Sequence, residues 1–170
     1  MQIVNIVATV KLSSPLDLSE LQKRLEGAEF AKGATWLKMR LKPEDHYIAF
    51  YKSGKFLITG LDSTEKIEAV ADRVLSLLCG AGIEAERESL TIQNYVLMDR
   101  LELSSSLESL IHTLGMEEAS YEPEQFPGLI YKRWGATFLL FNSGKFIATG
   151  LKDEQKAKRV IEQFKQMLER

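Results

Sequence analysis

The sequence predicts an α+β fold built from two copies of one unit, in which helices cover one side of an antiparallel sheet. Three observations support this prediction. The segment YKSGKFLITGL at Tyr51–Leu61 recurs as FNSGKFIATGL at Phe141–Leu151. Runs of alternating apolar residues, typical of strands, are joined by short connections that favour antiparallel pairing. Each copy also contains amphipathic helical stretches, which all need an apolar surface to pack on.

The repeat extends beyond this segment. IVNIVATVKL at Ile3–Leu12 matches IQNYVLMDRL at Ile92–Leu101. Periodic leucines also match between the halves, at Leu18, Leu21 and Leu25 and at Leu107, Leu110 and Leu114. These matches predict a tandem duplication, with residues 1–84 as the first repeat and residues 85–170 as the second.

Each half predicts the same elements in the same order: a strand, a short helix, three strands and a longer helix. Ser-rich segments supply N-cap candidates for the short helices, and Ser-Gly-Lys predicts a tight hairpin with Gly54 and Gly144 at positive φ. The strands are expected at Ile3–Val10, Trp36–Leu41, Tyr47–Tyr51, Phe56–Thr59, Leu90–Leu101, Leu129–Trp134, Thr137–Phe141 and Phe146–Thr149. The helices are expected around the periodic leucines and at Ser63–Leu78 and Asp153–Leu168.

Composition limits the classes of protein. The chain has 170 residues, 45% hydrophobic and 27% charged, which is typical of a globular protein. No apolar run approaches the roughly 18 residues needed to span a bilayer, and the start has no signal-peptide pattern. The single cysteine, Cys79, is expected to be a small core residue in a reducing compartment. The net charge of −2 lacks the basic excess usual in proteins that bind nucleic acid through phosphates.

One face of the predicted sheet has no helix to cover it. Alternation places Asn5 and Val7 on this face and Ile6 and Ala8 on the other. Such a surface favours an interface, either with another chain or its own copy, or with a DNA minor groove. The groove floor at A·T pairs offers only acceptors, which suit Asn and Thr donors. Equivalent strands add Asn94, Val96, Leu57, Thr59, Leu139, Phe141, Ile147 and Thr149 to the same kind of surface.

The segment YEPEQFPGLIYKR at Tyr121–Arg133 places Phe126 beside Pro127 and Gly128 at a loop tip. Burial of such a ring is worth about 1.5–3 kcal/mol, so a ring at a tip needs another partner. In the minor-groove interpretation, Phe126 inserts between base steps as a wedge.

These segments resemble the conserved core of the TATA-box-binding protein family over nearly the whole chain. The matching motifs are VNIVATV, SGKFLITG, IQNYV, SYEPEQFPGLIYK and FNSGKFIATG. The resemblance implies a saddle-shaped, curved, ten-stranded antiparallel sheet with helices on the convex side, whose underside widens and kinks the minor groove. Minor-groove wedging and bending are established for this family, which is itself the standard example of both.

The resemblance also implies roles for individual residues. Polar groove contacts fall on Asn5, Asn94, Thr59 and Thr149, and apolar groove contacts on Val7, Val96, Leu57, Ile147 and Leu139. Wedge residues fall on Phe126, Pro127, Phe141, Tyr51 and Trp36. Phosphate contacts fall on Arg40, Lys55, Lys132 and Lys145. The turn with Glu122, Glu124 and Gln125 resembles the docking site for transcription factor B, although from composition alone it is a solvated turn.

The function implied by the resemblance is that of a general transcription initiation factor of archaeal type. Such a factor binds A·T-rich promoter DNA, bends it, and recruits transcription factor B and the RNA polymerase assembly. The resemblance implies no enzymatic activity, cofactor, metal or membrane partner, and it leaves open a homodimer through the saddle when the protein is free. The expected location is the archaeal cytoplasm and nucleoid, or the nucleus in a eukaryote.

The first half departs from the family pattern. FAKGATWLKMR stands where the second half has YEPEQFPGLIYK, so the wedge position falls on Ala34 or Thr35, and Trp36 is the nearby aromatic residue. Tyr51 replaces phenylalanine, and Ala49 replaces the preceding leucine. Trp36 is either an intercalating residue or a structural tryptophan. The alternative function is that of a divergent paralogue, which regulates transcription by binding proteins and has weakened or altered DNA binding.

Catalysis and metal binding have little support in the sequence. His46 and His112 occupy unmatched places in the two copies, and neither has a cysteine or histidine at metal-ligand spacing. GAGIEAE at Gly80–Glu86 lacks the spacing of a dinucleotide fingerprint.

Overall fold

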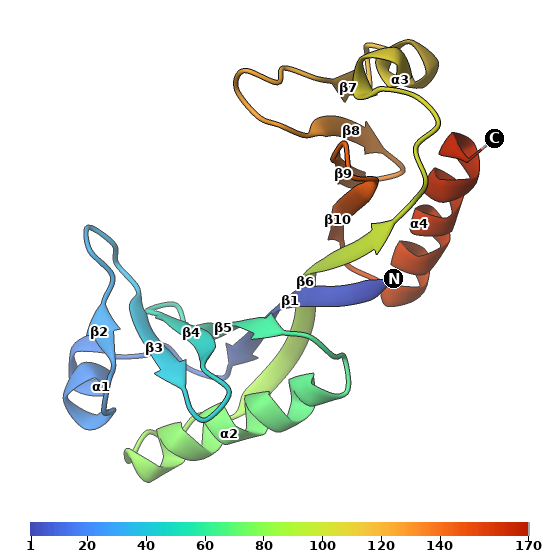
Figure 1. The fold of residues 1–170 in the computed structure, drawn as a ribbon. Coiled ribbons are helices and arrows are strands. Elements are labelled where there is room, and N and C mark those ends of the chain that lie inside the picture. The colour runs from blue at the N-terminus through green and yellow to red at the C-terminus, as the bar shows by residue number, and fades with distance from the viewer. Residues whose placement is uncertain (170) are drawn as a thin grey trace. The chain divides into compact units, whose positions relative to one another are not determined.

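The computed structural model describes residues 1–169, and within this range the chain forms ten strands and four helices. The strands are β1 (Gln2–Leu12), β2 (Glu29–Phe30), β3 (Leu37–Leu41), β4 (His46–Tyr51), β5 (Lys55–Leu61), β6 (Arg87–Arg100), β7 (Ala119–Ser120), β8 (Leu129–Arg133), β9 (Ala136–Leu140) and β10 (Lys145–Leu151). The helices are α1 (Leu18–Arg24), α2 (Lys66–Gly80), α3 (Leu107–Leu114) and α4 (Glu154–Leu168). The order strand, helix, four strands, helix therefore occurs twice (Figure 1).

The strands of residues 1–169 form one ten-stranded sheet in the order β2-β3-β4-β5-β1-β6-β10-β9-β8-β7. The ladders within each half are antiparallel, as short connections require. The predicted α+β class and ten-stranded antiparallel sheet are confirmed. The two edge strands, β2 and β7, have two residues each and so carry no alternation that residue patterns could detect.

The chain divides into two compact units. The first unit is Asn5–Gln93, and the second unit combines Met1–Val4 with the chain from Asn94 onward. Both β1 and β6 cross this division, so the spatial units do not end where a sequence repeat would end. The repeat boundary between residues 84 and 85 stays a prediction about the sequence.

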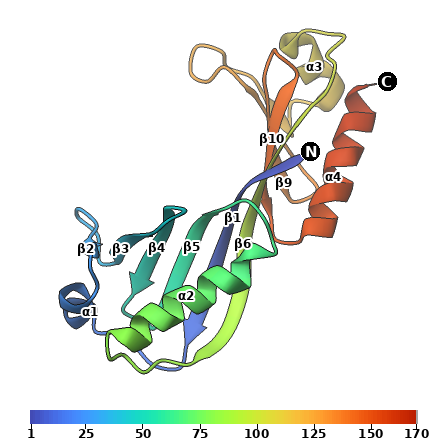
Figure 2. The same cartoon turned by 60° about the horizontal axis from the view of Figure 1, so that its bottom comes forward.

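In the first unit, the long helix covers one face of the strands. Figure 2 shows α2 lying across this face. From β1, Ile6, Ala8 and Val10 all point into the core at 0% exposure. Helix α2 packs on β5 with an apolar stripe of Ile67, Val70, Ala71, Val74 and Leu78. The buried apolar side chains of β1 and of the α2 stripe therefore lie between the strands and the helix. No helix of this unit, Asn5–Gln93, packs on the opposite face of these strands (Figure 2).

In the second unit, aromatic rings fix α4 on the sheet. Phe164 of α4 stacks on Phe138 of β9, with ring centroids 4.1 Å apart. The ring of Phe146 on β10 also contacts the Phe164 ring, edge-on, with centroids 5.1 Å apart. Such pairs add about 0.5–1.5 kcal/mol each beyond the area that they bury. Because these rings all lie under α4, the core of the second unit also occupies one face of its strands.

Side-chain caps start most of the helices. The predicted serine cap of the second short helix is confirmed at Ser106, whose hydroxyl accepts from the Ser109 N–H at 3.3 Å. In the first copy the cap is Asp17 rather than a serine. The expected start of α2 at Ser63 was wrong: the helix begins three residues later, at Lys66, after a residue that makes no side-chain cap bond.

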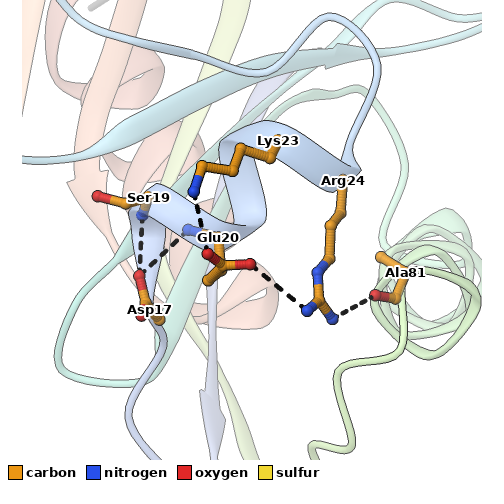
Figure 3. A network of polar contacts seen from close by, with 6 residues as sticks. All are labelled: Asp17, Ser19, Glu20, Lys23, Arg24 and Ala81. Carbon is orange, nitrogen blue, oxygen red and sulfur yellow. Dashed lines mark hydrogen bonds and ion pairs between the residues drawn. The ribbon is translucent and has the colours of Figure 1, made fainter.

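A polar network ties α1 to the end of α2 (Figure 3). The Asp17 carboxylate accepts two backbone N–H groups at the start of α1, each at 3.1 Å. One turn on, Glu20 pairs with Arg24 at 3.4 Å, and Arg24 donates to the carbonyl oxygen of Ala81 at 3.2 Å. Exposed ion pairs contribute about 0–1 kcal/mol each, so this network orients α1 more than it stabilises the fold.

Glycines close the two long hairpins as predicted. Gly54 has φ +91° and Gly144 has φ +79°. A Cβ atom at either position would overlap a backbone carbonyl oxygen, that of Ser14 or that of Leu101. Only glycine therefore fits both the conformation and the space.

Cys79 is exposed, so the prediction of a buried cysteine was wrong. It follows Leu78, the last residue of the α2 apolar stripe, and one step of about 100° turns it toward solvent. No helix in the described chain is long and apolar enough to cross a membrane. Within residues 1–169, no three His, Cys, Asp or Glu side chains are grouped so that they could hold a metal ion.

Candidate nucleic-acid interface

The face opposite the helices carries partly exposed side chains in each unit. On β1, Asn5 and Val7 are half-buried on this face, whereas Ile6 and Ala8 are fully buried in the core. Asn94 repeats the pattern on β6, between residues that face away from it. The other aliphatic residues expected on this face are half-buried as well: Val96, Leu57, Ile147 and Leu139. We call this surface the helix-free face of each unit.

The orientation of the Asn5 amide is fixed by a bulge in β5. The register between β1 and β5 shifts between Ile6 and Ala8, where Gly60 adopts φ +91°. The Gly60 N–H, which the bulge removes from the strand ladder, donates to Asn5 Oδ1 at 2.8 Å, and the Thr59 hydroxyl donates to the same oxygen at 3.2 Å. Because both partners are donors, the oxygen must face them, and the Nδ2 group keeps its N–H donors for another acceptor.

The second unit repeats this arrangement at Asn94. The Gly150 N–H donates to Asn94 Oδ1 at 2.7 Å, and Gly150 also has φ +91°. Asn94 Nδ2 donates to the Thr149 hydroxyl at 2.9 Å. An amide NH2 group has two donors, so one remains for a partner outside the unit. The four polar residues predicted for the face therefore form two equivalent Asn–Thr pairs.

The aliphatic residues differ between the units. In the second, Ile147 of β10 lies opposite Leu139 of β9, and both are half-buried. In the first, Leu57 lies opposite Ala49, which is 1% exposed although it lies on the same face. The smaller side chain sits below its neighbours, so the first unit offers less aliphatic surface here.

Phe126 and Phe141 form an aromatic pair on the second unit. Their ring centroids are 5.9 Å apart and their planes meet at 63°. The turn before Phe126 is closed by its own N–H, which donates to the Glu122 carbonyl oxygen at 2.9 Å. Gly128 leaves room for the rings, because a Cβ atom there would lie 2.7 Å from Cε1 of Phe126 and 3.1 Å from Cε1 of Phe141. Pro127 is exposed beside them.

The first unit holds a different aromatic pair at the equivalent place. Trp36 and Tyr51 have ring centroids 6.3 Å apart and planes at 38°. Leu37 and Leu129 begin equivalent strands, so Trp36 corresponds to Gly128 rather than to Phe126. The tryptophan thus brings its ring to Tyr51 from a position where the second unit has no side chain.

Tyr47 belongs to this cluster and was missed by sequence reasoning. Its hydroxyl accepts the Trp36 Nε1–H at 3.2 Å. Tyr47 pairs across the sheet with Thr59, where the second unit has Thr137 opposite Thr149. The alternation of β4 carries the signal that could have found it, because Tyr47 lies on the same side of the strand as Tyr51.

The four predicted phosphate-binding cations are all exposed: Arg40, Lys55, Lys132 and Lys145. The ion pairs found in residues 1–169 involve none of these four side chains. Arg40 lies over the Tyr47 ring at 5.3 Å, and Lys55 lies over the Tyr51 ring at 5.2 Å. Two cations are therefore held beside the aromatic cluster of the first unit by cation–π contacts.

The acidic turn is open to solvent. Glu122, Glu124 and Gln125 are all exposed, next to the edge strand β7. Nearby, Arg133 pairs with Glu118 at 3.0 Å, and the guanidinium also contacts the Tyr131 hydroxyl. Burial is the main cause that raises the pKa of Tyr131, while Arg133 acts against it. The ion pairs found in residues 1–169 involve neither Glu122 nor Glu124.

Comparison with known proteins identifies the family of the chain. The family described as "Transcription factor TFIID (or TATA-binding protein, TBP)" matches residues 1–81 and 89–170. The structure is similar to that of Methanococcus jannaschii TBP, with a TM-score of 0.86 and 34% sequence identity, over 99% of this chain and 97% of that one.

Relatives with known names give the same result. The TATA-box-binding protein of Picrophilus torridus is 34% identical over 172 residues, which cover 99% of this chain and 94% of the relative. TATA-box-binding protein C of Halobacterium salinarum is 35% identical over 170 residues, covering 96% of this chain and 94% of the relative. The TATA-box-binding protein of Methanocaldococcus jannaschii is 36% identical over 164 residues, covering 94% and 88%. The chain belongs to the TATA-binding protein family of transcription factors.

Proposed function

We propose that the protein initiates transcription by covering the minor groove of A·T-rich promoter DNA with the helix-free faces of its two units. The observation that carries this proposal is the pair of oriented amides. Gly60 and Gly150 hold the amide oxygens of Asn5 and Asn94, so N–H donors remain on the open side. At A·T pairs the groove floor presents only the acceptors A N3 and T O2.

The aliphatic surroundings of the amides supply selectivity. Val7 and Val96 lie two residues from the asparagines on the same face and offer no acceptor. A guanine amino group beneath them would lose its water without gaining a partner. Leaving such a buried donor unpaired costs about 1–3 kcal/mol, so G·C pairs are disfavoured at these positions.

The half-buried aromatic rings of each unit supply the distortion. Phe126 and Phe141 would enter a base step as a wedge beside Pro127, and Trp36 and Tyr51 would do so in the first unit. Unstacking a step costs a few kcal/mol, and the bent duplex then covers more of the protein. This arrangement would therefore bend the DNA.

Exposed cations that form no ion pair would let the protein contact DNA phosphates although its net charge is −2. We assign Arg40, Lys55, Lys132 and Lys145 to phosphate contacts, because each is exposed and none of them forms an ion pair within residues 1–169. Each phosphate neutralised adds about −0.9 to the slope of log K against log salt. Four contacts would give an appreciable but moderate salt dependence.

The acidic turn is the proposed docking site for transcription factor B, through Glu122, Glu124 and Gln125. Recruitment of the RNA polymerase assembly would follow from that contact, and the protein would act at the chromosome, in the nucleoid of an archaeon.

When free, two molecules could cover their apolar helix-free faces by forming a homodimer. The second candidate function, a protein-binding regulator, is favoured only by the altered wedge of the first unit.

Fluorescence anisotropy with labelled duplexes tests the proposal. An A·T-rich duplex should bind, and replacing its A·T pairs with inosine·cytosine should preserve binding, because inosine lacks the guanine amino group in the minor groove. Replacement with G·C should abolish it. Phe126→Ala should weaken binding to the A·T duplex, whereas Met116→Ala, a control at a side chain that is 77% exposed, should not. Failure of the chain to bind any of these duplexes would leave the protein-binding regulator as the better account.

A further inference from the structure

We propose that Tyr47 positions Trp36 as the wedge of the first unit, by accepting the indole N–H that would otherwise enter the base stack unpaired. This inference rests on the proposed function and adds to it a residue pair that the second unit does not have. The pair would allow a tryptophan to replace phenylalanine at a site of base insertion.

The first step of the argument concerns the indole itself. A phenylalanine ring has no hydrogen-bonding group, so Phe126 can enter a stack without losing a partner. An indole carries one donor, Nε1–H, and a buried indole usually needs an acceptor. An unpaired donor costs about 1–3 kcal/mol, which is comparable to the gain from stacking one base on an aromatic ring. Trp36 therefore needs a hydrogen-bond acceptor on the protein itself, which stays bonded to the indole N–H when DNA is bound.

Tyr47 supplies that acceptor from the protein side. Its hydroxyl oxygen lies 3.2 Å from Trp36 Nε1. Tyr47 lies on β4, a strand paired on both sides, so its backbone is fixed by Arg40 of β3 and Thr59 of β5. The Arg40 guanidinium also lies 5.3 Å from the centre of the phenol ring. The acceptor is thus held in place in the free protein.

The second unit shows why this tyrosine is linked to the tryptophan. Thr137 occupies the position equivalent to Tyr47, and its short side chain extends little above the sheet. The wedge there is Phe126, which needs no acceptor. In the first unit, tyrosine replaces this threonine and tryptophan replaces the phenylalanine wedge. The two replacing side chains are joined by one hydrogen bond.

The alternative is that the bond only packs the surface of the free protein. In that case its loss would lower the free energy of unfolding, and the effect on DNA binding would not depend on the indole. A positioning role predicts the reverse. Stability would change little, because both side chains are only half-buried, and the effect on binding would require the indole N–H.

A double-mutant cycle in the full chain separates these possibilities. It compares Tyr47→Phe, Trp36→Phe and the double variant, all in a Trp134→Phe background that leaves Trp36 as the only tryptophan. Tyr47→Phe removes one oxygen and keeps the ring under Arg40. Affinity for an A·T-rich duplex is measured by anisotropy, stability by thermal unfolding, and stacking by quenching of Trp36 emission.

We expect duplex binding to quench Trp36. Tyr47→Phe should weaken binding about 5- to 150-fold when Trp36 is present, from the cost of an unpaired donor and about 1.4 kcal/mol per tenfold. In the Trp36→Phe background the same change should cost less than about twofold, because no donor remains to be satisfied. Tight binding with equal losses in both backgrounds, or with unquenched Trp36, would overturn the inference and leave the proposed function intact. Absence of binding by the parent chain would overturn both.

Discussion

The dual role of the groove-facing asparagines gives a sharp test. Asn94→Asp keeps an oxygen that can accept the Gly150 N–H, now 2.7 Å from the amide oxygen, but it replaces the Nδ2 donors with a charged acceptor. The fold should therefore tolerate the change, whereas a minor-groove floor of A N3 and T O2 acceptors should not. Asn94→Ala removes both functions and serves as the comparison.

The size of each effect follows from the contacts. Asn94→Asp should change the free energy of unfolding by about 0.5 kcal/mol or less, since the Gly150 N–H keeps its acceptor, and the Thr149 hydroxyl, which loses the bond from Nδ2, can donate to the carboxylate instead. Asn94→Ala should cost about 1 kcal/mol, the net worth of a typical hydrogen bond. On DNA, a buried charge without a donor costs more than about 1–3 kcal/mol, which corresponds to a loss in affinity of at least about tenfold.

Anisotropy titration with an A·T-rich duplex, with thermal unfolding in parallel, measures both quantities. Gln163→Glu is the matched control, because it adds the same charge at an exposed amide side chain of the same unit, on helix α4 and not on the helix-free face. The control should bind within about twofold of the parent, which corresponds to roughly 0.4 kcal/mol. An Asn94→Asp variant that binds as tightly as this control would refute the assignment of Asn94 as a groove donor.

Two further predictions concern the fold. Gly144→Ala and Gly135→Ala place alanine at the same φ, +79°, but a Cβ atom meets the Leu101 backbone only in the first. Gly135→Ala should cost about 1–2 kcal/mol and Gly144→Ala clearly more, as measured by denaturant unfolding; equal costs would contradict the crowding seen at Gly144. Separately, the hydrogen bond from Arg73 lowers the pKa of Glu44. The ionised carboxylate is thus favoured in the fold, and this small stabilisation is lost as pH falls through the folded-state pKa. NMR titration should show the pKa rising toward its ordinary value in Arg73→Met; an unchanged pKa would refute this cause.

Much of the fold was predictable because the chain contains it twice. A single copy of VNIVATV indicates a strand, but the match with IQNYV also identifies Asn5 and Asn94 as equivalent positions. The recurrence of glycine at Gly54 and Gly144 likewise indicates two equivalent hairpin turns. Edge strands β2 and β7 could not be found from residue patterns, because two residues carry no period.

The site was harder to predict where the copies differ. Alignment by sequence placed the first wedge at Ala34 or Thr35, because the shorter loop hides the register. Because Leu37 and Leu129 begin equivalent strands, Trp36 is the residue equivalent to Gly128 in the second copy. Tyr47 was missed because its importance lies in one hydrogen bond to a residue outside its own strand, which no linear pattern records.

The bulge at Gly60 shows a second limit of sequence reasoning. The motif Thr-Gly-Leu was visible in both copies, but its glycine could equally have closed a turn. The structure shows instead that Gly60 and Gly150 present an N–H to an asparagine across the sheet. The physical role of the asparagine oxygen, and hence the direction of its donors, emerges only from that contact.

The central claim is that the helix-free faces lie on the floor of an A·T minor groove, and NMR of the complex tests it most directly. Adenine H2 protons lie only on that floor, whereas thymine methyl groups lie in the major groove. With methyl-labelled valine, we expect nuclear Overhauser contacts between adenine H2 and the methyl groups of Val7 and Val96. Contacts of these methyl groups with thymine methyls, or an absence of any contact with DNA in a saturated complex, would contradict the account.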